Sequence, residues 1–75
     1  MTVNIKIGEW AAKYSKTGEF PLKLPKGATV EDVMHLLNLP QDETGFCAVA
    51  NKHVARGHEL KEGDDVKFFP CIVGG

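Results

Sequence analysis

The residues best suited to chemistry stand at the C-terminal end of the sequence, which closes with Ile72-Val73-Gly74-Gly75. At a typical glycine usage of about 7%, two glycines in the last two positions arise by chance in about one chain in 200. Glycines are costly to order and pack nothing, but a segment without Cβ atoms can enter a narrow channel. The alternative is an ordinary frayed terminus. We expect a flexible tail over residues 71–75 that carries the Gly75 carboxylate to another protein, with Gly74 providing access.

A backbone carboxylate such as that of Gly75 is a poor electrophile. It becomes reactive once it is adenylated, because a sulfur nucleophile can then displace AMP as the leaving group. The sequence contains no G-x-x-x-x-G-K phosphate loop, and a chain of 75 residues has no room for a nucleotide-binding fold. Activation must come from a partner that uses ATP and Mg²⁺. The chain is therefore expected to be a carrier and a substrate, without a cofactor of its own, and not an enzyme.

Other reactive side chains form no convincing site. Cys47 and Cys71 lack a C-x-x-C arrangement, so reduced thiols are expected, with a regulatory disulfide between them as a minor hypothesis. The three histidines, at positions 35, 53 and 58, have no ligand set and are expected to be solvated. Asp64 and Asp65 follow Gly63, which favours a structural role in a turn over paired catalytic carboxylates.

Composition excludes several classes of protein. Nine basic and ten acidic side chains give a net charge of −1 without a basic cluster, which argues against nucleic-acid binding. Residues 1–10 alternate polar and apolar types, so neither a signal peptide nor a membrane span is expected there. A cytoplasmic location follows as the default expectation. A single small domain at this length has little interior for a catalytic cleft.

The elements that must position the tail follow from hydrophobic periodicity. Two alternating runs, residues 3–7 and 20–24, predict half-buried strands, and Pro21 places the second at a sheet edge. Residues 8–18 between them predict a helical turn that packs Trp10 as a lid on the core. Thr29 and Asp32 predict the capped start of a helix that Leu39-Pro40 ends.

The second half of the chain predicts three more strands. An apolar run at residues 46–51 and a short segment at His53-Val54 precede a turn at residues 60–64. Residues 65–70 predict the last strand, with Val66 and Phe68 facing inward and Phe69 outward. A right-handed crossover places this last strand beside the first. The expected fold is α+β: a β-grasp (ubiquitin-like) domain over residues 1–70, with a mixed sheet of four to five strands and one main helix.

Several short motifs together resemble the ubiquitin-like sulfur-carrier family of the ThiS/MoaD type, which contains the thiamine-pathway carriers and the small subunits of molybdopterin synthase. The resemblance covers essentially the whole chain. Its motifs are the run from Leu24 to Val30 that leads into the helix, Ala48-Val49-Ala50-Asn51, Leu60 with Gly63-Asp64 and Val66, Phe69-Pro70, and the closing Gly74-Gly75. Each motif is weak alone, and their order and spacing are specific.

The resemblance implies a mechanism and partners. An E1-like enzyme would adenylate Gly75, a sulfurtransferase or cysteine desulfurase would supply sulfur, and the resulting thiocarboxylate would donate it in the active site of an acceptor synthase subunit. Phe69 and Pro70 with Ile72 and Val73 are the expected partner-binding residues, in part because an apolar patch beside a reactive tail suits docking.

The receiving pathway is less defined. Phe69-Pro70 and the insertion at residues 8–18 favour the molybdopterin or tungsten-cofactor branch, whereas the short connection after the helix resembles thiamine carriers. Two further functions stay open: a ubiquitin-like modifier joined to lysines, which shares the same acyl-adenylate, and an interaction module with an inert tail. An iron–sulfur protein is excluded because two cysteines cannot supply four ligands.

Overall fold

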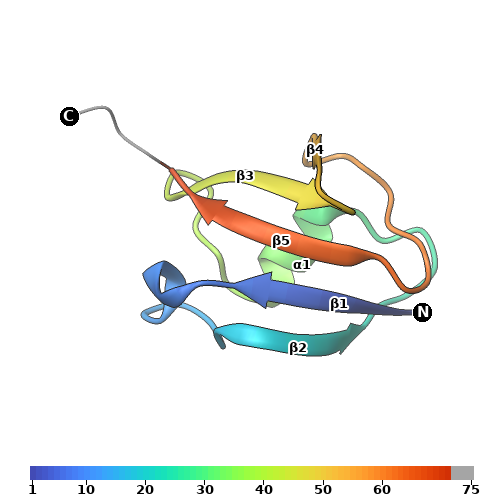
Figure 1. Ribbon diagram of the computed structural model, residues 1–75, viewed down its shortest axis with the longest axis horizontal. Helices are drawn as coiled ribbons and strands as arrows, with labels where there is room; N and C mark the ends of the chain where they lie inside the picture. Colours follow the sequence, from blue (N-terminus) through green and yellow to red (C-terminus); the bar gives the residue numbers. More distant parts are fainter. Residues whose placement is uncertain (72–75) are drawn as a thin grey trace.

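Seven elements follow the predicted order along the chain. The computed structural model describes residues 1–71. The elements are β1 (Thr2–Ile7), the 3-10 turn η1 (Glu9–Ala11), β2 (Gly18–Lys23), α1 (Val30–Leu36), β3 (Thr44–Val49), β4 (Lys52–Val54) and β5 (Asp65–Pro70) (Figure 1). The predicted tail residues Ile72, Val73, Gly74 and Gly75 lie outside the described residues, so the expected boundary at residue 70 stays a prediction.

The strands form one mixed sheet in the order β2-β1-β5-β3-β4. β1 and β5 run parallel, as the right-handed crossover requires, while the other neighbouring pairs are antiparallel. β2 lies at an edge, which confirms the placement of Pro21, a residue with no N–H for a further strand to bond. This arrangement is the β-grasp fold, and the last strand lies between the first and the third.

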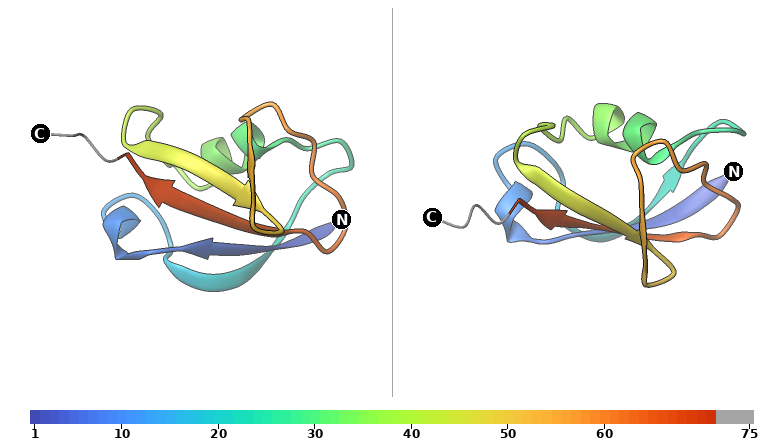
Figure 2. Two further views of the ribbon diagram at one scale, coloured as in Figure 1. Left: turned by 45° about the horizontal axis from the view of Figure 1, so that its top comes forward. Right: turned by 90° about the horizontal axis from the view of Figure 1, so that it is seen from above.

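Helix α1 covers one face of the sheet, and no helix of the described chain covers the other (Figure 2). Between the sheet and α1 lies the core, whose fully buried side chains are Val3, Ile5 and Ile7 from β1, Val30, Val33 and Met34 from α1, and Val66 from β5. Burying each such side chain stabilises the fold by about 1.5–3 kcal/mol. The opposite face carries the outward side chains of the strands, and we call it the open face.

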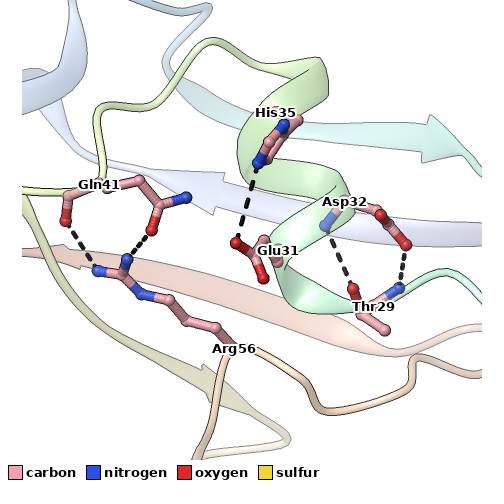
Figure 3. A network of polar contacts seen from close by, with 6 residues as sticks. All are labelled: Thr29, Glu31, Asp32, His35, Gln41 and Arg56. Carbon is pink, nitrogen blue, oxygen red and sulfur yellow. Dashed lines mark hydrogen bonds and ion pairs between the residues drawn. The ribbon is translucent and has the colours of Figure 1, made fainter.

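The start of α1 confirms the predicted capping box. Thr29 Oγ1 accepts a hydrogen bond from the Asp32 backbone N–H at 3.3 Å, and the Asp32 carboxylate accepts one from the Thr29 N–H at 2.8 Å (Figure 3). The end of the helix differs from the prediction. α1 stops at Leu36, before Leu39-Pro40, because Asn38 adopts a left-handed conformation with φ of 57°.

Two loop regions also differ in detail from the sequence-based expectation. The apolar run predicted over residues 46–51 is a strand only to Val49, since Ala50 and Asn51 have φ of 51° and 65° and form the two-residue turn into β4. The helical turn expected over residues 8–18 is a single 3-10 turn, η1, followed by irregular chain. Trp10 nevertheless packs half-buried against the core, as predicted.

Within residues 1–71, none of the helices has the length and apolar character needed to span a bilayer.

Candidate functional site: the open face of the sheet and the end of β5

Along each of the strands β3 and β5, successive side chains point to opposite faces of the pleated sheet. On β5, Val66 and Phe68 face the core and Phe69 faces away, as predicted. For β3, the sequence did not decide which side chains face the core. Pairing settles it, because Cys47 lies opposite the buried Phe68, which places Phe46 and Ala48 on the open face beside Phe69.

Three side chains form an aromatic patch on this open face: Phe46, His53 and Phe69. The rings of Phe46 and Phe69 stack with centroids 4.5 Å apart and an interplanar angle of 18°. His53 on β4 meets Phe46 edge-on at 4.2 Å. Phe46 is 41% exposed, an unusual fraction for phenylalanine, and only Leu36 on α1 is a more exposed large apolar residue among residues 1–71.

Two lysines lie next to the aromatic patch. Lys6 of β1 and Lys67 of β5 are neighbours in register, and Lys67 is also in register with Ala48 of β3. The Lys67 ammonium lies 3.5 Å from the Asn51 side-chain oxygen. The single ion pair within residues 1–71 joins Glu31 and His35 on α1, so neither lysine has a carboxylate partner in the described part of the chain. The open face is therefore apolar at the aromatic patch and of mixed charge beside it, since Glu19 of β2 is in register with Lys6 and Asp65 lies two residues before Lys67 on β5.

The end of β5 lies against the loop that precedes β3. Pro70 is in register with Thr44, and the Cys71 N–H donates to the Glu43 carbonyl oxygen at 2.9 Å. The hydroxyl of Tyr14, in the segment between β1 and β2, donates to the Glu43 carboxylate. This hydrogen bond raises the pKa of Tyr14, so the hydroxyl stays a protonated donor at neutral pH. Cys71 is thus tied to the body of the domain two residues after Phe69.

Arg56 holds the same loop from its other side. Its guanidinium donates to the backbone carbonyl oxygen of Gln41 at 2.9 Å and to the Gln41 side chain (Figure 3). It also donates to the Thr44 carbonyl oxygen at 2.8 Å. Thr44 Oγ1 donates to the Pro40 carbonyl oxygen at 2.9 Å. These contacts fix the start of β3, and with it the strand against which β5 ends.

The two cysteines occupy different environments, which argues against the hypothesis of a disulfide. Cys47 faces the core opposite Phe68, whereas Cys71 is exposed and bonded to Glu43, beyond the end of the β3–β5 pairing. Burial raises the pKa of the Cys47 thiol to about 12, so it stays protonated and weakly nucleophilic at neutral pH.

This difference predicts selective thiol labelling. With iodoacetamide at neutral pH, the native protein should gain one carbamidomethyl group, at Cys71, and a second at Cys47 only in denaturant. Peptide mass spectrometry after timed quenching measures both rates. Equal labelling of Cys47 and Cys71 in the native state would contradict the buried placement of Cys47, and a sample without reactive thiols would support the disulfide.

The three histidines are exposed, as expected, although His53 also packs against Phe46, and Asp64 has the turn role that the sequence favoured. His35 pairs with Glu31 at 3.9 Å on the solvent side of α1 (Figure 3), and His58 is exposed. Over residues 1–71, no group of three or more His, Cys, Asp or Glu side chains could hold a metal ion. The Asp64 carboxylate accepts the Lys61 N–H at 2.8 Å and so closes the predicted turn.

The sequence predicted that Phe69 faces outward, which the structure confirms, but it did not identify Phe46 and His53 as its neighbours on this face. The partner-binding roles of Phe69 and Pro70 stay predictions. A signal for Phe46 existed in its two-residue spacing from Ala48, which puts both on one face of a strand. No local signal placed that face outward. The other predicted site residues, Ile72, Val73, Gly74 and Gly75, lie outside the described part of the chain.

Comparisons with known proteins agree with this architecture. The family model described as "ThiS family" matches residues 9–75. A solved structure from Pyrococcus furiosus, described as a candidate molybdopterin converting factor, subunit 1, is 26% identical, with a TM-score of 0.75, and the match covers 96% of this chain and 99% of that one. Among curated proteins, no significant match is found.

Two further structures share the fold at lower identity. SAMP1 from Haloferax volcanii is 17% identical with a TM-score of 0.73, and the match covers the whole of both chains. A complex of subunits 1 and 2 of the molybdopterin-converting factor from Helicobacter pylori contains a chain that is 18% identical with a TM-score of 0.65, again over the whole of both chains. The family match spans most of the chain, and the fold is the expected β-grasp. This chain therefore belongs to the ThiS family, which confirms the resemblance indicated by its sequence motifs.

Proposed function

We propose that this protein is a cytoplasmic sulfur carrier whose Gly75 carboxyl group is converted to a thiocarboxylate for cofactor biosynthesis. The observation that carries the proposal is the ThiS-family match, which continues through residue 75 and so includes Gly74-Gly75. The described geometry is compatible with this role, because the chain beyond Cys71 begins beside the open aromatic patch.

The proposed chemistry has three balanced steps, and none is performed by this chain's own side chains. A partner uses ATP and Mg²⁺ to join the Gly75 carboxylate to AMP, with release of pyrophosphate. The terminal sulfur of a persulfide on a sulfur-donating enzyme attacks the acyl carbon, forms a C–S bond and displaces AMP. A thiol then attacks the sulfur that belongs to the donating enzyme, breaks the S–S bond, and leaves the thiocarboxylate on Gly75 and a disulfide on the thiol and the enzyme.

Docking to the activating enzyme is proposed to use the aromatic patch. Exposed aromatic side chains contribute strongly to protein interfaces because they bury large areas with few rotatable bonds. Phe46 and Phe69 already support each other by stacking, so little side-chain freedom remains to be lost on binding. Beside the patch, Lys6 and Lys67 lie together with Glu19 and Asp65, so a partner surface that is apolar at its centre and carries charges of both signs at its edge is the complementary one.

The length of chain between this surface and Gly75 restricts where the adenylating centre of the partner can lie. Gly75 is six positions after Phe69 and four after Cys71, so that a fully extended chain beyond Cys71 reaches at most about 14 Å. A partner docked on the aromatic patch therefore has its adenylating centre within reach of Gly75 only if that centre opens close to the end of β5.

The molybdopterin or tungsten-cofactor branch is the proposed destination of the sulfur. The Pyrococcus furiosus protein, described as a candidate molybdopterin converting factor subunit, matches this chain at 26% identity over nearly its whole length. The Helicobacter pylori structure is a complex of subunits 1 and 2, and one of its chains shares this fold. By analogy, the acceptor of the thiocarboxylate would be a larger synthase subunit that binds this chain.

Intact-mass spectrometry tests the proposal. The protein is incubated with an E1-like adenylating enzyme, ATP-Mg²⁺, a cysteine desulfurase, cysteine and a thiol, and the control omits ATP. A mass gain equal to the exchange of one oxygen for one sulfur, with ATP present only, is the expected result. No gain would contradict the carrier function, whereas a ladder of conjugates in lysate would favour the ubiquitin-like modifier.

A second step separates the two pathways. The thiocarboxylate form is mixed with either the large subunit of a molybdopterin synthase and its pterin precursor or a thiazole synthase with its substrates. Product in the first mixture is expected. Product only in the second would assign the protein to thiamine biosynthesis.

A further inference from the structure

Gly45 sits where the end of β5 comes closest to β3. Thr44 pairs with Pro70 and Phe46 pairs with Phe69, so Gly45 is the extra residue of a β-bulge between them. A Cβ atom placed on Gly45 would lie 2.8 Å from the Pro70 carbonyl carbon and 2.9 Å from Cys71 Cα, and closer still to the Pro70 carbonyl oxygen. All three are backbone atoms, which no side-chain rotation can move aside. Only glycine fits this contact without displacing the end of β5.

The contact belongs to a small assembly that we call the root clamp, residues 43–45. Glu43 accepts the Cys71 N–H at 2.9 Å, Thr44 is in register with Pro70, and Gly45 admits the Pro70 carbonyl group. Arg56 and Tyr14 hold the clamp from two separate loops, through the Thr44 carbonyl oxygen and the Glu43 carboxylate. Three parts of the chain distant in sequence therefore converge on the point where β5 ends.

We propose that Gly45 is a positioning residue for the reaction at Gly75. Because Gly45 has no side chain, the root clamp contacts Pro70 and Cys71 closely. These contacts fix the distance and direction from the aromatic patch to the start of the C-terminal segment. This inference rests on the proposed function. Four residues after Cys71 span at most about 14 Å, so a displacement at the clamp shifts the region that the Gly75 carboxyl group can reach. Misplacing a reacting group by about 1 Å can lower a rate by up to about 100-fold.

Gly45→Ala tests the positioning role, with Gly57→Ala as the matched control. A Cβ atom placed on Gly57 would have no heavy atom within 4 Å, and the φ of Gly57 is not positive, so alanine there should be silent. The kcat and KM for adenylation are measured by ATP–pyrophosphate exchange with an E1-like enzyme, at a temperature where circular dichroism shows both variants folded. We expect kcat to fall by about 10-fold in Gly45→Ala, with KM within about twofold of wild type.

The division between kcat and KM distinguishes positioning from general damage, since Gly45→Ala keeps all three side chains of the aromatic patch, on which KM is proposed to depend. An unchanged kcat in Gly45→Ala overturns the inference, and so does a rise in KM that accounts for the whole effect. A wild-type chain that is not adenylated would instead overturn the proposed function, and the inference with it.

Tyr14→Phe provides a second test if Gly45→Ala does not fold. It keeps the ring and removes only the hydroxyl that donates to Glu43. We expect faster hydrogen exchange of the Cys71 amide, measured by NMR, and a smaller fall in kcat, of about two- to threefold. Unchanged exchange together with unchanged kcat would show that the clamp does not control the end of β5, and would overturn the inference.

Discussion

Deletion of Gly75 should lower thiocarboxylate formation by at least about 100-fold while leaving the fold intact. The deletion withdraws the terminal carboxyl by one residue, about 3.5 Å along an extended chain, and a misplacement of about 1 Å already costs up to about 100-fold in rate. The core is built from residues 3–68, so the melting temperature should be unaffected. Intact-mass spectrometry under single-turnover conditions gives the rate of sulfur incorporation.

A competition experiment distinguishes a variant that docks without reacting from a variant that no longer docks. The variant without Gly75 retains the aromatic patch and should inhibit activation of the wild-type chain with a Ki close to the wild-type KM. Full sulfur transfer by the variant would show that Gly75 is not the reacting residue. If the variant instead neither reacts nor competes, the C-terminal residue is also a major part of the docking surface.

Phe46→Ala should raise the KM for adenylation by about 30-fold with little change in kcat. Aromatic residues at the centre of an interface typically cost about 2 kcal/mol or more when truncated, which corresponds to this factor. The substitution removes the stacking partner of Phe69 and the edge contact of His53, so it dismantles the aromatic patch. Because Phe46 is 41% exposed, the cost in folding stability should be modest. Steady-state pyrophosphate exchange at varied carrier concentrations gives both constants.

Leu36→Ala is the matched control for the docking surface. Leu36 is 59% exposed and is a large apolar side chain like Phe46, but it lies on α1, on the other face of the sheet (Figure 2). The control should leave KM and kcat at wild-type values. Equal effects from the two substitutions, or an unchanged KM in Phe46→Ala, would remove the aromatic patch as the docking site.

Local chemistry accounts for what the sequence predicted well. The alternation of apolar and polar residues over 3–7 and 65–70 depends only on which side chains avoid water. Both segments form strands, and the apolar side chains expected to face the core do so. The capping box at Thr29 and Asp32 is a contact across three residues, and it forms as predicted. Boundaries differed where a single backbone conformation decides them. Asn38, a residue type that tolerates the left-handed conformation, ends α1 through a positive φ, and Ala50, a type that rarely adopts it, ends β3 in the same way.

By itself, the sequence determined the ThiS-family fold, its order of elements and the candidate reacting residue. Only the tertiary structure decided that Cys47 is buried and Cys71 exposed, that Phe46 and His53 join Phe69, and that Gly45 accommodates Pro70. The reason is physical. Each of these facts depends on the register between strands that are far apart in the chain, and a shift by one residue turns every side chain to the opposite face.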